Sequence, residues 1–266
     1  MPLRSANITV MVQAAHKAAR HLVRDFGEVE NLQVSIKGPG DFVSAADRRA
    51  EQILRQELAR ARPGFGFLLE ESGVVEGRDA SQRWIVDPLD GTTNFLHGLP
   101  HFAISIALEQ RGELVAGVIY DPLKDEMFCA EKGAGAYLND RRLRVSRRGD
   151  LASCLIGTGI PVLDWRGRER GFAAQLERVS DEVAGIRRLG TASLDLAYLA
   201  AGRLDGFWEY GLKPWDMAAG VVLVREAGGL VGRLEGDAEL LDEGTLVAGN
   251  PTVFPRLAEL LRSATP

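Results

Sequence analysis

The most informative stretch of the chain is Trp84-Ile85-Val86-Asp87-Pro88-Leu89-Asp90-Gly91-Thr92-Thr93-Asn94-Phe95. Its first three residues are apolar and predict a short buried strand. Because Pro88 cannot donate a hydrogen bond to a sheet, we expect this strand to end at Asp87, with Asp90 one tight turn later. Both carboxylates can then point into one pocket at the carboxyl end of the strand.

The pair formed by Asp87 and Asp90 indicates a cation site. Two carboxylates a few ångströms apart repel each other unless a proton or a cation lies between them. The stretch contains no His or Cys, so we expect a hard, oxygen-seeking cation such as Mg²⁺, with the main-chain oxygen of Leu89 as a further ligand. The residues from Gly91 to Asn94 are typical of a helix start, where free N–H groups favour a phosphate. A lone motif of this kind is more often a helix cap with surface aspartates.

Two further acidic positions share this local pattern. Glu70 follows the apolar run Phe65–Leu69, and Asp216 stands at the start of a predicted helix, Trp215-Asp216-Met217-Ala218-Ala219-Gly220. Each alone is more typical of a solvated strand end or a helix cap. Their occurrence together with the aspartate pair favours one shared acidic site.

Hydrophobic periodicity predicts helices and an antiparallel sheet in the first half of the chain. Residues 8–26 and the segment from Ala45 to Pro63 have the spacing of helices, so two helices are expected before any sheet. Apolar runs at Phe65–Leu69 and Trp84–Val86 are typical of strands. The segments 102–108 and 114–120 flank an Arg-Gly-Glu turn and predict a hairpin.

The second half alternates between strands and helices. A strand is expected at Cys154–Ile156, and helices at Phe172–Val179, Ala192–Ala201 and Asp216–Ala227. This alternation predicts a mixed sheet covered by helices. No repeat or flexible linker divides the chain, so we expect a single catalytic domain over 1–266 with sub-layers of about 1–145 and 146–266.

Composition and charge exclude several classes of function. The chain has 32 basic and 37 acidic side chains, a net charge of −5, and so lacks a broad cationic surface for nucleic acid. The two cysteines, Cys129 and Cys154, have no nearby Cys or His with which to form a disulfide framework or a zinc site. No apolar run has the pattern of a membrane span or a secretory signal. We therefore expect a soluble, cytoplasmic protein that binds neither membranes nor nucleic acid directly.

Three stretches together resemble the inositol monophosphatase family. They are Asp87–Phe95, Trp215–Gly220 and Leu69-Glu70-Glu71-Ser72. The likeness extends over nearly the whole chain and is closest to the bacterial SuhB-type members, especially across Arg188–Tyr198 and Gly211–Trp215. Together with the order of predicted elements, it implies an α/β layered fold, an α-β-α-β-α sandwich.

The resemblance also implies a metal site and a group that orients water. In the family, the matching sites hold two or three Mg²⁺ ions; here they are Glu70, Asp87, Asp90, Asp216 and the main-chain oxygen of Leu89. Thr92, hydrogen-bonded to Asp47, is implied as the hydroxyl that orients the attacking water. The catalytic residues expected on this basis are Thr92, Asp47, Glu70 and Asp90.

The substrate contacts that the resemblance implies divide between a phosphate side and an alcohol side. The N–H groups of Gly91 and Thr92, with Thr93 beside them, are expected to hold the phosphate, and Lys37 resembles a lysine near the metals in the family. On the alcohol side the matching positions are Asp90, the main chain of Ala192, Glu209 and Asp216. The region from Gly157 to Arg170 departs from a clear pattern, so the rest of the alcohol pocket is not assigned.

The function implied is a lithium-sensitive, Mg²⁺-dependent phosphomonoesterase that hydrolyses inositol monophosphate with a metal-activated water, acting as a homodimer. Alternative substrates within the superfamily are histidinol phosphate, fructose 1,6-bisphosphate and adenosine 3′,5′-bisphosphate. A second alternative is a regulatory role in binding other proteins, with the site retained.

Other chemistries fit the sequence less well. Phosphatases of the haloacid dehalogenase type have one residue between their two aspartates, whereas two residues separate Asp87 and Asp90. P-loop enzymes need Gly-Lys-Ser/Thr, and none of the five lysines follows a glycine. His97 and His101 have metal-like spacing, but Pro100 breaks the helix that would align them, so we expect surface or supporting histidines.

Overall fold

The computed structural model describes residues 5–29, 34–38, 41–160, 169–234 and 240–264. Its helices are α1 (Ala6–Phe26), α2 (Ala45–Ala61), α3 (Thr92–Leu96), α4 (Glu169–Ser180), α5 (Ala192–Ala200), α6 (Pro214–Glu226), α7 (Leu240–Glu243) and α8 (Val253–Ser263). Its strands are β1 (Val34–Gly38), β2 (Asp41–Ser44), β3 (Phe65–Leu69), β4 (Gly73–Val75), β5 (Asp79–Asp90), β6 (Ala103–Gln110), β7 (Glu113–Asp121), β8 (Glu126–Glu131), β9 (Gly135–Leu138), β10 (Arg141–Arg142), β11 (Leu155–Thr158), β12 (Gly185–Arg187), β13 (Gly206–Glu209), β14 (Leu230–Gly232) and β15 (Leu246–Gly249). None of these helices is both long and apolar enough to cross a membrane.

The first large sheet has the strand order β10-β9-β8-β7-β6-β5-β3-β4. The predicted hairpin is present as β6 and β7, which pair antiparallel. The prediction of an antiparallel sheet holds for every neighbouring pair except β3 and β5, which are parallel. The exception arises because β4 pairs with the outer side of β3 and reverses the chain, so that β5 enters the other side of β3 in the same direction.

The second large sheet is mixed, as predicted, with the order β12-β11-β13-β15-β14. Strand β11 lies parallel to both β12 and β13, whereas β15 lies antiparallel to β13 and β14. The expectation that two helices precede any sheet is wrong, since β1 and β2 pair antiparallel between α1 and α2. These strands have five and four residues, which is too short for hydrophobic periodicity to identify them.

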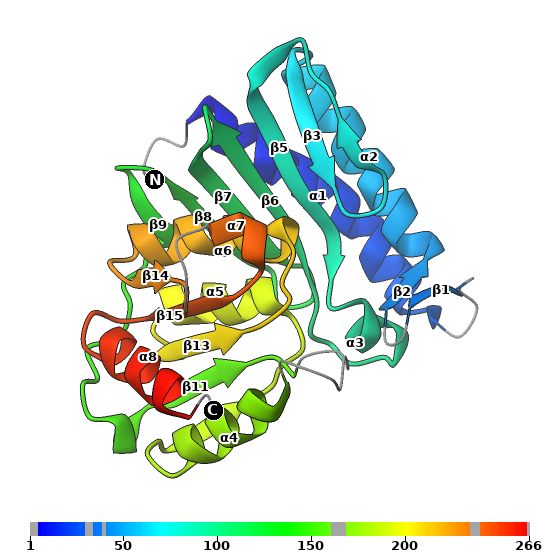
Figure 1. The fold of residues 1–266 in the computed structure, drawn as a ribbon. Helices are drawn as coiled ribbons and strands as arrows, with labels where there is room; N and C mark the ends of the chain where they lie inside the picture. The colour runs from blue at the N-terminus through cyan, green and yellow to red at the C-terminus, as the bar shows by residue number, and fades with distance from the viewer. Residues whose placement is uncertain (1–4, 30–33, 39–40, 161–168, 235–239, 265–266) are drawn as a thin grey trace.

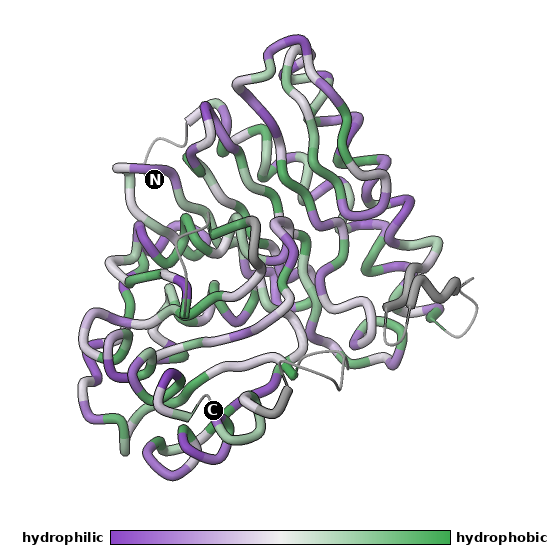
Figure 2. The backbone as a smooth tube through the Cα atoms, viewed as in Figure 1, coloured by the Kyte–Doolittle hydropathy of each residue, from purple (hydrophilic) through white to green (hydrophobic). Residues whose placement is uncertain are grey.

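The layers follow the predicted α-β-α-β-α order (Figure 1). Helices α1 and α2 pack together on one face of the first sheet, and α5 and α6 lie between the two sheets. Helices α4 and α8 pack against each other, and α8 covers the far face of the second sheet at β13 and β15. Figure 2 shows both hydrophobic and hydrophilic stretches along α1 and α2, as expected for helices with one buried face.

Strand β6 is buried on both faces, and its alternation explains how the layers are joined. Ile104, Ile106 and Leu108 belong to the core shared with α1 and α2. Ala103 and Ala107 belong to the core shared with α5 and α6. Because successive side chains of a strand point to opposite faces, one strand serves two cores. The neighbouring β5 follows the same pattern, which directs side chains from its end toward α6.

Close packing of β7 against α6 requires glycine at position 117. A Cβ added to Gly117 would lie 2.5 Å from the carbonyl oxygen of Ala219 and 2.9 Å from its Cα. We expect Gly117→Ala to lower the free energy of unfolding by about 1–3 kcal/mol, because helix and strand must move apart. Urea unfolding followed by circular dichroism measures this change.

The matched control is Gly64→Ala. An added Cβ at Gly64 has no heavy atom within 4 Å, so the free energy of unfolding should change by no more than about 0.5 kcal/mol. Equal effects of the two substitutions would contradict the packing argument.

Candidate active site

The predicted acidic residues meet where strands end and helices begin. Glu70 follows β3, Asp90 ends β5, Glu209 ends β13, and Asp216 lies in the first turn of α6. These ends surround a cavity of about 260 Å³, lined by Glu70, Asp90, Gly91, Thr92, Thr93, Thr158, Gly159, Arg188, Gly190, Thr191, Ala192, Asp195, Glu209, Leu212 and Asp216. A larger cavity of about 520 Å³ along α2 has none of the predicted site residues among its described lining.

The end of β5 differs from the sequence prediction. The strand does not stop at Asp87 but continues to Asp90, with a register shift against β6 between these two residues. Asp87 pairs with Ser105 and Asp90 with Ala103, so Pro88 and Leu89 together face the single residue Ile104. This is a β-bulge, one of the few places where a sheet accepts a proline. Pro88 has no N–H to donate to the sheet, and a bulge within the strand accommodates it without ending the strand.

Asp87 is buried beside Glu70. Its Oδ1 accepts a hydrogen bond from the Leu89 N–H at 2.9 Å, and its carboxyl also shares a hydrogen bond with that of Glu70. Burial raises the pKa of Asp87 well above its usual value, and negative charge on Glu70, Asp90 and Asp216 raises it further. A carboxylate at this position therefore requires positive charge nearby.

Asp90 lies against the start of α5. Its Oδ2 accepts a hydrogen bond from the Ser193 N–H at 2.8 Å. Burial raises the pKa of Asp90 to about 6, although hydrogen bonds from Ser193 and from the main chain of Gly91 and Ala192 act in the opposite direction. The helix start thus fixes the carboxylate and partly supports its charge.

Asp216 and Glu209 complete the acidic lining. Asp216 Oδ2 accepts from the Lys213 N–H at 2.7 Å, which fixes the side chain at the start of α6. Burial raises the pKa of Asp216 well above its usual value, and the charge of Asp90 adds to the effect. Burial likewise raises the pKa of Glu209 to about 8, with Asp90 contributing and Arg188 opposing. The carboxyl groups of Asp90, Glu209 and Asp216 come from β5, β13 and α6, which are distant in sequence. When charged, they repel one another across the cavity.

Thr92 and Asp47 are joined as expected. The Thr92 hydroxyl lies 3.0 Å from Asp47 Oδ1 and 3.0 Å from the carbonyl oxygen of Leu89. Asp47 is fully buried at the start of α2, where the Ser44 N–H donates to its Oδ2 at 2.8 Å. Burial raises the pKa of Asp47, and hydrogen bonds from Ser44 and Thr92 lower it. Its carboxyl group holds the Thr92 hydroxyl at the edge of the cavity.

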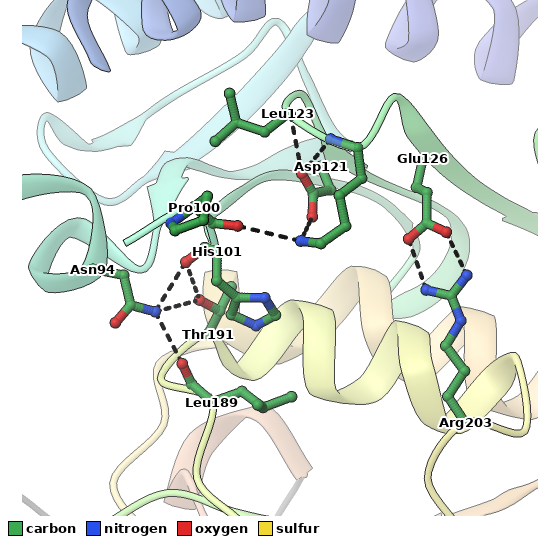
Figure 3. A network of polar contacts seen from close by, with 10 residues as sticks. Asn94, Pro100, His101, Asp121, Leu123, Glu126, Leu189, Thr191 and Arg203 are labelled. Atoms are coloured by element: carbon green, nitrogen blue, oxygen red, sulfur yellow. Dashed lines mark hydrogen bonds and ion pairs between the residues drawn. The ribbon is translucent and has the colours of Figure 1, made fainter. Parts of the chain in front are cut away.

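Asn94 ties the loop before α5 to the segment after α3 (Figure 3). Its Nδ2 donates to the carbonyl oxygens of His101 and Leu189, both at 2.9 Å. The Thr191 hydroxyl also donates to His101 O, at 3.2 Å. These bonds hold Thr191 so close to Gly91 that an added Cβ would lie 2.5 Å from Thr191 Oγ1, and the Gly91 φ of +91° also favours glycine.

The donor set fits an oxygen-seeking divalent cation. Carboxyl groups whose charges disfavour one another in a buried site need compensating positive charge, and carboxylate oxygens are preferred ligands of Mg²⁺. Among the described residues, no group of three or more His, Cys, Asp or Glu side chains is already arranged as a metal centre. The fit therefore rests on donor chemistry and charge, with Glu70, Asp87, Asp90 and Asp216 as candidate ligands.

One known protein family matches nearly the whole chain. The model of the inositol monophosphatase family matches residues 4–265. The chain belongs to this family. It is therefore a member of a family of phosphatases, one that is in general metal-dependent.

Individual relatives agree with this assignment. The chain is 62% identical to an inositol-1-monophosphatase of Mesorhizobium japonicum, over 97% of both chains. It is 44% identical to a protein of Pseudomonas aeruginosa named Nus factor SuhB, again over 97% of both. The crystal structure of the extragenic suppressor protein suhB from Bartonella henselae aligns with a TM-score of 0.93 and 58% identity, covering 97% of this chain and 99% of that chain.

Three of the family-predicted residues lie just outside the cavity lining, and the side chain of a fourth is not described. Asp87 and Leu89 are buried beside the lining, as is Asp47 behind Thr92. The backbone of Lys37 belongs to β1, and its side chain lies outside the described part of the structure. Residues 161–168 of the unassigned stretch also lie outside the described residues.

The two histidines do not line the cavity, in agreement with the sequence analysis. His97 is exposed just after α3. The His101 ring lies edge-on to Tyr198, and burial, followed by the charge of Lys124, lowers its pKa to about 4. A neutral His101 therefore serves as part of the packing beneath the site.

Sequence reasoning missed several cavity residues in this member of the inositol monophosphatase family. They are Thr158, Gly159, Arg188, Gly190, Thr191, Asp195 and Leu212. For Asp195 a signal was present: it is an acidic residue inside the otherwise apolar helix segment Leu194 to Ala197, and such residues are rarely buried without a reason.

Proposed function

We propose that this protein is a Mg²⁺-dependent phosphomonoesterase that hydrolyses inositol monophosphate to inositol and phosphate. The observation that carries the proposal is that Glu70, Asp90 and Asp216 line one small cavity beside Gly91 and Thr92, with Asp87 buried against Glu70. The family of the chain and the activity for which its 62% identical relative is named support the same substrate.

The residues that would hold two or three Mg²⁺ ions are Glu70, Asp87, Asp90, Asp216 and the main-chain oxygen of Leu89. When bound, such ions lower the pKa of a water molecule and stabilise the charge that develops on the phosphoryl oxygens and the leaving alkoxide. The carboxyl groups supply the negative charge that retains the ions, and the hydrogen bond from the Ser193 N–H keeps Asp90 in place.

Thr92 and Asp47 would orient the attacking water. Because the Thr92 hydroxyl can donate its proton to Asp47 Oδ1, its lone pairs remain available to accept a hydrogen bond from water. A water held there would attack phosphorus as the bond to the alcohol oxygen breaks. The water gives up a proton and the leaving alkoxide takes one up, so the products are phosphate and the free alcohol and no covalent enzyme intermediate is required. In this proposal the N–H groups of Gly91 and Thr92, with Thr93, would hold the phosphate.

The opposite lining of the cavity suits an alcohol with several hydroxyl groups. Glu209 and Asp216 offer carboxyl oxygens, and Ala192 offers its main chain. Carboxyl oxygens accept hydrogen bonds from hydroxyls, which favours a polyol over an aryl or alkyl group. Histidinol phosphate, fructose 1,6-bisphosphate and adenosine 3′,5′-bisphosphate are the competing substrates of this proposal.

A second candidate function is binding to other proteins, with the catalytic site retained. It is favoured by the Pseudomonas aeruginosa relative, which is named as a Nus factor. We further propose a cytoplasmic homodimer, inhibited by Li⁺, in which residues 1–266 form a single catalytic domain.

The proposal is tested by phosphate release from inositol 1-phosphate and the three competing substrates, with Mg²⁺ and after its removal by chelation. Because the ions supply both the nucleophile and charge stabilisation, we expect chelation to reduce the rate at least about a hundredfold and Mg²⁺ to restore it. Inositol 1-phosphate should be the best substrate. Equal rates with and without Mg²⁺ would refute the metal-dependent mechanism, and a higher kcat/KM for another compound would refute the substrate assignment.

A further inference from the structure

Asp195 lies at the start of α5 with its side chain in the lining of the cavity. The residue is only 1% exposed. The charges that act on its carboxyl group are those of Glu209, Asp90 and Arg188, so it lies near the end of the cavity that Glu209 lines. The mechanism proposed above gives this residue no role.

One carboxyl oxygen of Asp195 has no hydrogen-bond partner among the described residues. Its Oδ1 is buried and accepts no hydrogen bond in the described part of the chain. A buried polar atom without a partner lowers stability unless a water, an ion or a ligand supplies the missing hydrogen bond. The unsatisfied atom of Asp195 is thus an observation that a purely structural role leaves unexplained.

Asp205 shows what a structural aspartate looks like in the same region. It is also 1% exposed, but its Oδ1 accepts from the Ser146 hydroxyl and from Arg148, and its Oδ2 accepts from the Leu155 N–H at 2.8 Å. Both oxygens of Asp205 therefore have a protein donor, whereas Asp195 borders the cavity and its Oδ1 has no donor among the described residues.

Three residues that share the cavity lining with Asp195 do not supply the missing hydrogen bond. The Thr158 hydroxyl lies 2.9 Å from the carbonyl oxygen of Trp208 and 3.1 Å from that of Gly159, so its proton is directed to the main chain. At Gly159 an added Cβ would overlap the Glu209 carboxyl group, so this glycine leaves room for Glu209 at the end of β11. Glu209 is itself a carboxyl group and its charge opposes ionisation of Asp195.

We propose that Asp195 is a specificity-determining residue that forms a hydrogen bond with a hydroxyl group on the alcohol part of the substrate, next to the hydroxyl bound by Glu209. This inference rests on the proposed function. Burial favours the neutral form of Asp195 by raising its pKa well above the usual value, and a neutral carboxyl group both donates and accepts, as a hydroxyl does. The substrate class is therefore phosphate esters of alcohols with several hydroxyl groups.

The test compares Asp195→Leu and Asp195→Asn with the wild-type enzyme in Mg²⁺. We measure kcat and KM for inositol 1-phosphate and for phenyl phosphate, which has no hydroxyl groups on its ring. Asp195→Leu should raise KM for inositol 1-phosphate and lower the ratio of the two kcat/KM values about tenfold or more, because the substrate hydroxyl loses its partner. Asp195→Asn should retain most of this ratio, since an amide both donates and accepts.

The matched control is Asp205→Asn, and the second readout is the melting temperature. Asp195→Leu should leave the melting temperature unchanged or higher, because no protein hydrogen bond is lost, whereas Asp205→Asn should lower it and keep the substrate ratio of the wild type. An unchanged ratio in Asp195→Leu, or equal losses for both substrates, would overturn the inference. Failure of the proposed function would be visible in the wild type, as no preference for any polyol phosphate over phenyl phosphate, and would overturn both.

Discussion

Replacing Asp90 with asparagine is expected to lower kcat for phosphate release by about a thousandfold or more, because one carboxylate serves both as a candidate metal ligand and as electrostatic support at the reacting oxygens. The substitution keeps the size of the side chain and an oxygen that can accept from the Ser193 N–H. The charge is the main property removed. Steady-state phosphate release at saturating Mg²⁺ measures the effect.

Asp121→Asn is the matched control for Asp90→Asn. Asp121 is fully buried and is not part of the cavity lining. Its carboxyl group accepts from the N–H groups of Leu123 and Lys124 and pairs with the Lys124 side chain (Figure 3). Its substitution should lower the melting temperature and leave kcat close to that of the wild type. A near-normal rate in Asp90→Asn would reject the assignment of the active site.

The same variant should change how stability depends on pH in the absence of metal. Burial raises the pKa of Asp90 from 3.8 to about 6, so the folded protein binds this proton more tightly than the unfolded chain. The contribution of Asp90 to stability therefore falls as pH rises from about 4 to 6. Asp90→Asn should lack this part of the pH dependence.

Thr92→Ala is expected to lower kcat by about a hundredfold, a typical contribution for a group that positions a proton in the transition state. The hydroxyl lost is the one that lies 3.0 Å from Asp47 Oδ1. The affinity for Mg²⁺ should stay within a few-fold, because the carboxyl ligands and the Leu89 oxygen remain. Kinetics at saturating Mg²⁺ and a Mg²⁺ titration separate the two effects.

The conservative variant Thr92→Ser is the control for this role. It retains the hydroxyl and should recover most of the rate lost in Thr92→Ala. If Thr92→Ala lost metal affinity and rate in the same proportion, the hydroxyl would act by holding the Leu89 oxygen, to which it also lies within 3.0 Å, and the assigned role would be wrong.

Local signals were enough to predict much of the fold. The amphipathic pattern of residues 8–26 corresponds to α1, and the Arg-Gly-Glu turn corresponds to the connection between β6 and β7. The acidic residues Glu70, Asp90 and Asp216 could be placed together because each follows a strand or starts a helix, where chain ends converge. These features depend on residues close in sequence, and a single sequence carries that information.

Other features depend on contacts between distant segments. The pairing of β1 with β2 and the parallel pair β3 and β5 follow from how the chain returns, which periodicity does not encode. Asp195 stands out because its Oδ1 has no hydrogen-bond partner among the described residues. These strand pairings and side-chain contacts are visible only in the three-dimensional structure.

The extra residue in β5 has a consequence for the spacing of the two aspartates. In an uninterrupted strand, residues three apart point to opposite faces, so Asp87 and Asp90 would be separated by the sheet. Here their partners Ser105 and Ala103 are two apart, which restores the phase of the pleat and brings both acids out on the side of α6. The bulge and the spacing are therefore linked: with the same two residues between them and no bulge, the two carboxylates would lie on opposite sides of the sheet.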